Sequence, residues 1–143
     1  MSDDIGAFLT LHYVIPGDLM AAGEASSSVR NKLIQLGVSS QKVKKAAISM
    51  YEAEINAVIH AGGGEAFVYI KPEKIVIVLE DHGPGIPDIE QAMQEGFSTA
   101  PERIREMGFG AGMGLPNMKC YSDRLDIKSE VGKGTTITIE VDI

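Results

Sequence analysis

Hydrophobic residues recur every three or four positions in the stretch that follows Pro16-Gly17. This spacing predicts an amphipathic helix that packs one face on a core. Asp18 is a good N-cap for its start, and Gly37 suits its C-terminal cap. The apolar positions of this single predicted helix are Leu19, Ala22, Val29, Leu33 and Leu36.

A second helical pattern begins after Ser39 or Ser40, either of which can cap it, and continues to about Ala61. Gly62-Gly63-Gly64 ends it. Its apolar stripe consists of Val43, Ala47, Met50, Ala57 and Ala61. Later in the chain, Pro87-Asp88 starts a short predicted helix to about Glu95, and Met113–Ser122 predicts another.

Strand patterns lie between and after these helices. Phe8–Ile15 predicts a first strand, and Ala66–Ile70 and Ile75–Glu80 predict an antiparallel hairpin because only Lys71–Lys74 joins them. Ile75–Leu79 is apolar throughout, which indicates a strand that is central or covered on both sides. The last two predicted strands are Leu125–Glu130 and Thr135–Ile143.

This order of elements predicts an α+β fold. We expect a two-layer sandwich with a mixed, mostly antiparallel sheet and helices on one face. The 143 residues suit a single domain, 1–143. Residues 96–112 show no periodicity, and a loop of this length in a small domain is usually functional or disordered.

Composition and charge narrow the class of protein. Twenty acidic residues against thirteen basic ones give a net charge of −7, which argues against general nucleic-acid binding and against docking on anionic membranes. No apolar run approaches the ~18 residues of a membrane span, and the acidic N-terminus does not resemble a signal peptide. We therefore expect a cytoplasmic protein. Cys120 is the single cysteine, expected in the core, and three scattered histidines make no metal set.

Three segments carry candidate chemistry, and Asp81 opens the first of them. It follows the apolar strand, and its carboxylate can accept a hydrogen bond from a ligand amino group. Gly83 and Gly85, before Ile86, would let the backbone approach a flat ring. An ordinary strand-to-loop turn with a solvated carboxylate explains this segment alone equally well.

The second segment places Glu52 and Asn56 one turn apart on the second helix. The Asn56 amide oxygen suits Mg²⁺ that carries waters and phosphates, and Glu52 could take a proton from an attacking hydroxyl. His60 follows one turn later. By itself, a solvated polar helix face is the commoner explanation.

The third segment is glycine-rich and leads into a helix. Its free backbone N–H groups and the helix N-terminus suit phosphate binding, although a flexible linker is the simple alternative. It is neither a Walker loop nor a dinucleotide fingerprint. The residues are Gly108, Gly110, Gly112, Met113 and Gly114.

Taken in order, these segments and Gly134-Thr135 resemble the Bergerat-fold ATPases, which include gyrase, the heat-shock chaperone, mismatch-repair ATPases and histidine kinases. The small size and the strings Asn56–His60, Asp81–Asp88 and Phe97-Ser98-Thr99 are similar to bacterial anti-sigma factor serine kinases and partner-switching switch kinases. The segment Ala100–Gly112 is longer than in the switch kinases.

The resemblance implies a role for each matching residue. Glu52 would be the general base, Asn56 would hold Mg²⁺, and Asp81 would bind the adenine amino group with support from Thr135. Arg105, or equally Arg103, would face the phosphates. The ring would lie beside Gly83, Gly85 and Ile86, and the phosphates beside Gly108, Gly110, Gly112, Met113 and Gly114.

The function expected from the resemblance is an ATP- and Mg²⁺-dependent serine/threonine kinase of a small antagonist protein. A sigma factor or a phosphatase is a further possible partner, and a homodimer through the first strand and helix is implied. Two alternatives stay open: an ATP-gated binding module without phosphotransfer, and a histidine-kinase catalytic domain that acts in trans.

Overall fold

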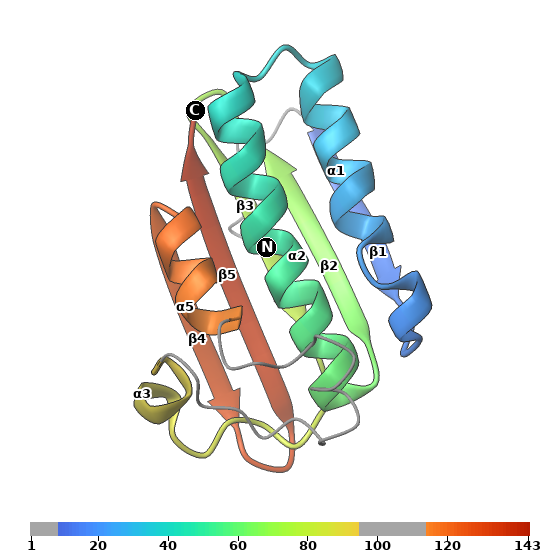
Figure 1. The fold of residues 1–143 in the computed structure, drawn as a ribbon, viewed down its shortest axis with the longest axis vertical. Helices are drawn as coiled ribbons and strands as arrows, with labels where there is room; N and C mark the ends of the chain where they lie inside the picture. Colours follow the sequence, from blue (N-terminus) through green and yellow to red (C-terminus); the bar gives the residue numbers. More distant parts are fainter. Residues whose placement is uncertain (1–8, 95–113) are drawn as a thin grey trace.

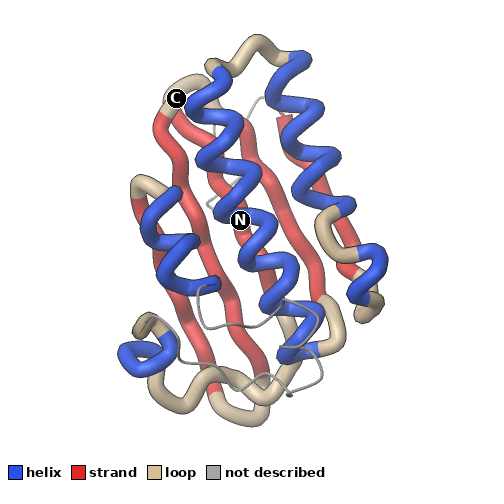
Figure 2. The backbone as a smooth tube through the Cα atoms, viewed as in Figure 1, coloured by secondary structure: helices blue, strands red, loops and turns tan. Residues whose placement is uncertain are grey.

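One five-stranded sheet and the helices that cover one of its faces make up the described part of the chain (Figures 1 and 2). The computed structural model describes residues 9–94 and 114–143. The strands are β1 (Leu9–Ile15), β2 (Gly64–Ile70), β3 (Lys74–Glu80), β4 (Arg124–Glu130) and β5 (Gly134–Asp142). The helices are the 3₁₀ turn η2 (Leu19–Ala21), α1 (Glu24–Gln35), α2 (Ser40–Ala61), α3 (Ile89–Ala92) and α5 (Gly114–Tyr121).

The strands lie in the order β1-β2-β3-β5-β4, so β3 is the central strand, as its apolar run predicts. Every pairing between these strands is antiparallel, which makes the sheet simpler than the mixed sheet expected. The predicted hairpin is present, with Ile70 opposite Ile75. The α+β, two-layer prediction is confirmed.

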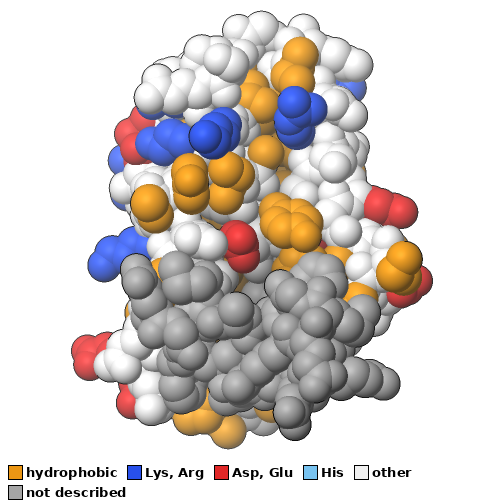
Figure 3. All heavy atoms as spheres, in the orientation of Figure 1, with side chains coloured by type: hydrophobic (Ala, Val, Ile, Leu, Met, Phe, Trp, Pro, Cys, Tyr) orange, Lys and Arg blue, Asp and Glu red, His pale blue; other side chains and the backbone are white. Residues whose placement is uncertain are grey.

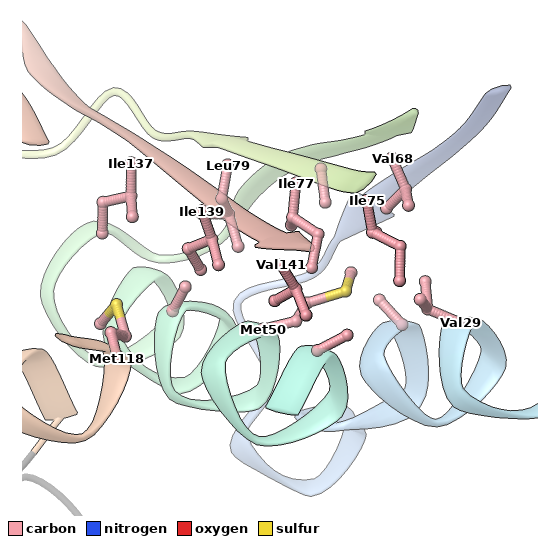
Figure 4. Packing of buried hydrophobic residues seen from close by; sticks show 14 of the residues in the cluster. Val29, Met50, Val68, Ile75, Ile77, Leu79, Met118, Ile137, Ile139 and Val141 are labelled. Carbon is pink, nitrogen blue, oxygen red and sulfur yellow. The ribbon is translucent and has the colours of Figure 1, made fainter. Parts of the chain in front are cut away.

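The core lies between the sheet and the helices. Ile75, Ile77 and Leu79 of β3 stand beside Ile137, Ile139 and Val141 of β5. Figure 4 shows these side chains meeting Val29, Met50 and Met118, which point up from α1, α2 and α5. Each such side chain contributes about 1.5–3 kcal/mol by burial, so this layer fixes α2 over the middle of the sheet.

The outer face of β3 is buried as well. Val76 and Val78 are only 2% and 4% exposed, and they cluster with Tyr69 of β2. Next to them, the His12 ring stacks on Phe67, with centroids 4.7 Å apart. Burial on both faces explains why β3 shows no alternation in its sequence.

The first predicted helix is wrong in one respect, because the chain breaks it at Gly23. Asp18 does cap a helical turn, but that turn is η2, where its carboxylate accepts from the Met20 N–H. Gly23 then takes φ +101° against the Tyr51 ring, and α1 begins after it. The predicted glycine at the other end of α1 is confirmed, since Gly37 has φ +81°.

Two further expectations need correction. The short helix that was predicted to run to about Glu95 ends at Ala92. Asp88 caps its start as expected, because its carboxylate accepts from the Gln91 N–H. Glu95 lies outside the described residues. Cys120 is exposed and not in the core, because α5 turns Leu115 and Met118 inward instead. None of the described helices is long and apolar enough to cross a membrane.

Candidate functional site

Asp81 lies at the end of the central strand, beneath the last turn of α2. It continues the inward-facing series of Ile75, Ile77 and Leu79, so its side chain turns toward the helix layer. A Cβ on Gly83 would stand 2.5 Å from the Cβ of Ala61. The first candidate segment therefore packs directly on the C-terminal end of the helix that carries Glu52 and Asn56.

The Asp81 carboxylate is held by two backbone donors. Its Oδ1 accepts from the Gly83 N–H at 3.0 Å and from the Thr135 N–H at 3.1 Å, and the Asp81 N–H donates to the Thr135 carbonyl at 2.9 Å. Asp81 is 9% exposed, and its Oδ2 bonds to no described residue. Because Oδ1 is occupied by these two donors, Oδ2 is the candidate acceptor for a hydrogen bond from a ligand.

Ser129, which the sequence analysis did not single out, supports this arrangement from β4. Its hydroxyl accepts from the Ile86 N–H at 2.7 Å and lies 2.9 Å from the Thr135 hydroxyl. Ser129 follows Leu125 and Ile127 on the inward face of β4. The sequence signal that could have revealed Ser129 is its position, because it is a polar residue that continues the apolar alternation of Leu125 and Ile127.

The glycines of this region are required by contacts within the chain. Gly85 has φ +82°, and a Cβ there would stand 2.6 Å from the Glu130 carbonyl oxygen. Gly134 has φ +136°, and a Cβ there would overlap the Asp81 carbonyl. The contact of Gly83 with Ala61 is of the same kind. Close backbone approach thus accounts for these glycines whether or not a flat ring also lies against them.

Glu52 lies where α2 meets the start of α5. Its Oε1 accepts from Nδ2 of Asn117 at 3.3 Å, and a Cβ on Gly114 would lie 3.6 Å from Oε2. Burial raises the pKa of Glu52, and the Asn117 hydrogen bond opposes that rise. A half-buried carboxylate of raised pKa beside a helix start is suited to accept a proton.

Asn56 and His60 continue the row from Glu52 toward Asp81. The half-buried Asn56 side chain makes no hydrogen bond to another described residue. Burial lowers the pKa of His60, while the charge of Asp81 opposes that effect, so these two side chains are near each other. By helix geometry Glu52 and His60 are about 12 Å apart along α2.

Glu54 is the most deeply buried charged residue described, and no role was predicted for it. It is 1% exposed, and it accepts from three backbone N–H groups at the start of α1. The signal was present: position 54 falls between Met50 and Ala57 in the buried stripe of α2, where an apolar residue would be expected.

The remaining predicted site residues lie outside the described ranges. They are Arg103, Arg105, Gly108, Gly110, Gly112, Met113 and the string Phe97-Ser98-Thr99. Gly114 is described and is the first residue of α5. The described residues hold no cluster of histidine, cysteine or carboxylate side chains suited to a metal ion, so the metal role of Asn56 stays a prediction.

The chain is similar to known proteins over most of its length. The family model described as histidine kinase-, DNA gyrase B- and HSP90-like ATPase matches residues 47–143. The chain is 32% identical over 124 residues to serine/threonine-protein kinase RsbT of Bacillus subtilis, covering 84% of this chain and 85% of that protein. It is 33% identical over 112 residues to an anti-sigma F factor of Geobacillus stearothermophilus, covering 74% and 73%.

Two solved structures share the fold. The RsbU and RsbW domains of Rv1364c from Mycobacterium tuberculosis align with a TM-score of 0.63 at 16% identity, covering 93% of this chain and 32% of that one. A chain of the SiaB–SiaC complex from Pseudomonas aeruginosa aligns with a TM-score of 0.55 at 13% identity, covering 93% and 89%.

Proposed function

This chain belongs to the histidine kinase-, DNA gyrase B- and HSP90-like ATPase family, and on that premise we propose that it is an ATP-dependent serine/threonine kinase of a small antagonist protein. The similarity to a serine/threonine kinase and to anti-sigma F factors supports the type of reaction. The geometry that supports it most is the row from Glu52 along α2 to Asp81, whose Oδ1 is held by two backbone N–H groups.

Asp81 is the proposed recognition group for adenine. With Oδ1 held by the Gly83 and Thr135 N–H groups, Oδ2 is fixed in place to accept from an exocyclic amino group. Ser129 and Thr135 stiffen the far side of this arrangement. A group positioned in advance binds its ligand with little ordering cost.

Glu52 is the proposed general base, and Asn56 the proposed protein ligand of Mg²⁺. Bound Mg²⁺ would neutralise charge on the phosphates. The acceptor hydroxyl oxygen forms a bond to the γ-phosphorus while the bond to the β–γ bridging oxygen breaks and ADP leaves. Glu52 takes the hydroxyl proton, for which its raised pKa suits it. Arg105 and the glycines before Gly114 are proposed phosphate contacts from the resemblance alone.

The proposal extends to partners and setting. A kinase that uses ATP is expected in the cytoplasm, and the anti-sigma F factors among the relatives suggest that a sigma factor is a further partner. A homodimer through the open edge of β1 is also proposed, because β1 is an edge strand whose outer backbone groups are unpaired in the sheet.

Calorimetry with MgATP, followed by phosphotransfer to proteins encoded beside this chain's gene, tests the proposal. Asp81→Asn should weaken ATP binding at least 100-fold, since the amide cannot hold the same pair of backbone donors and the ligand amino group. The matched control is Asp88→Asn, which preserves an N-cap in the same loop and should bind normally. Glu52→Ala should keep ATP affinity and lose transfer.

Each outcome discriminates between functions. Unchanged ATP affinity in Asp81→Asn removes the adenine role. Wild-type transfer by Glu52→Ala removes the base role. An acid-labile product would indicate a histidine kinase, and nucleotide-dependent partner binding without any phosphorylated product would indicate a binding module.

A further inference from the structure

A groove of about 810 Å³ runs between the outer sides of α1 and α2. It lies on the helix face of the molecule, where Figure 3 shows hydrophobic side chains with basic ones beside them. Its hydrophobic lining comes from both helices and from the short connection between them. That lining includes Ile34, Val38, Ala47, Ile48 and Tyr51.

The hydrophobic lining is partly open to solvent although the fold has a well-filled core elsewhere. Ile34 is 50% exposed and Tyr51 is 38% exposed. Val38, Ala47 and Ile48 are half-buried. An apolar strip between two neighbouring helices has the shape that a third helix fills, because side-chain ridges of one helix pack in the grooves of another.

The charge of the groove is opposite to that of the whole chain. Arg30 and Lys44 line it, both are exposed, and neither forms an ion pair with another described residue. The chain as a whole has a net charge of −7. Two cations that form no ion pair within the described ranges, beside an apolar strip, therefore favour a segment that carries acidic residues along its apolar side.

The same groove reaches the proposed catalytic base. Glu52 is one of its lining residues, next to Tyr51, and it is the one carboxylate among the described residues of the lining. A polypeptide that lies along the groove would therefore bring its end close to the carboxylate that we propose accepts the proton.

We propose that this groove is the docking site for an acidic amphipathic helix of the acceptor protein, and that docking there places a serine or threonine beside Glu52. The second half of the proposal, the placement of a serine or threonine beside Glu52, rests on the proposed kinase function. The binding half, the docking of an acidic helix, rests on the groove itself. Ile34, Ile48 and Tyr51 contact the apolar side of the docked helix. Arg30 and Lys44 pair with its carboxylates.

Fluorescence anisotropy with designed peptides tests the binding half without an identified acceptor. The probe is a labelled 18-residue helix-forming peptide with leucines on one face, glutamates beside them and a serine at one end. A second peptide carries lysines in place of the glutamates. We expect the glutamate peptide to bind at least tenfold more tightly, and Arg30→Glu/Lys44→Glu to reverse this preference.

Control variants separate local from general charge effects. Lys128→Glu makes the same kind of change on exposed β4 and should leave both affinities within twofold. Equal affinity for the two peptides, or an unchanged preference in the double variant, would overturn the proposal. So would a dimer of the wild type that Ile34→Glu dissociates, because a second copy would then be the occupant.

The acceptor, once phosphotransfer identifies it, tests the second half. The double variant should raise KM for the acceptor at least tenfold and leave kcat and the ATP affinity within twofold. A loss confined to kcat would contradict docking. Failure of ATP binding or of any transfer by the wild type would contradict the kinase proposal, and the peptide measurements would still decide the groove.

Discussion

Replacement of Glu54 tests the contact that joins α1 to α2. Its Oε2 accepts from the Gly23 N–H at 2.9 Å and the Ala25 N–H at 3.2 Å, and its Oε1 accepts from the Ser26 N–H at 3.0 Å. These are donors that the start of an α-helix leaves unpaired, and Gly23 has no side chain to bind them. A carboxylate 31 residues away in the next helix therefore serves as the cap of α1.

The magnitude follows from the donors that Glu54→Ala would leave without an acceptor. Ala25 and Ser26 are buried, and each unsatisfied buried N–H costs about 1–3 kcal/mol, which gives roughly 2–6 kcal/mol for the two. Gly23 is half-buried and its N–H can turn to water. A loss near 4 kcal/mol corresponds to a Tm lower by about 10–20 °C for a domain of this size.

The partial variant Glu54→Gln should have a stability between those of the wild type and Glu54→Ala. Its amide oxygen can accept from Gly23 and Ala25 as Oε2 does, but its NH₂ group then faces the Ser26 N–H. One unsatisfied donor predicts a loss of about 1–3 kcal/mol. The control is Glu52→Gln, the same change half a turn away without backbone donors, for which we expect a change within about 0.5 kcal/mol.

Urea unfolding monitored by circular dichroism measures these differences. Amide hydrogen exchange at Ala25 and Ser26 reports the local effect, since both should exchange faster in Glu54→Ala than the amides in the middle of α2. A loss below about 1 kcal/mol in Glu54→Ala would show that water replaces the carboxylate and that the reasoning is wrong.

Two further predictions concern the candidate site. Gly134→Ala adds a Cβ that overlaps the Asp81 carbonyl at a backbone φ of +136°, so it should weaken MgATP binding, measured by calorimetry, and lower the Tm. The control is Gly132→Ala, where φ is +82° but nothing lies within 4 Å of the added Cβ. This variant should lower the Tm and leave MgATP binding unchanged. Asn117→Ala removes the hydrogen bond that lowers the pKa of Glu52, so the acid limb of the phosphotransfer rate should move to higher pH. A limb that stays in place or moves to lower pH would contradict the role of Glu52 as base.

The elements that pattern alone predicted are those whose burial repeats regularly. The alternation of β5 follows directly from which face meets the core. In the predicted stripe of α2, Val43, Met50 and Ala57 are buried, whereas Ala47 and Ala61 are half-buried. The break at Gly23 was not visible, because Leu19 and Ala22 keep the helical spacing across it. At the break the Gly23 N–H donates to Glu54 of α2, and local spacing carries no information about a contact with another helix.

The site shows the same division. The Asp81 segment could be predicted because strand, carboxylate and glycines are adjacent in the chain. The support from Ser129 and the bond from Asn117 to Glu52 link positions 43 and 65 residues apart, so only the folded chain brings them together. Cys120 was placed wrongly because a helix of eight residues allows more than one choice of inward face.

The corner where β1, α2 and β2 meet has a practical consequence for labelling. Gly17 lies against the carbonyl of Gly62, Gly63 against that of Ile15, and Gly64 against that of Glu80. Main chain touches main chain there, which leaves no room for a reporter dye or an inserted tag. The exposed turn at Pro72 and Glu73, at the other end of the sheet in Figure 1, is the place for such a probe.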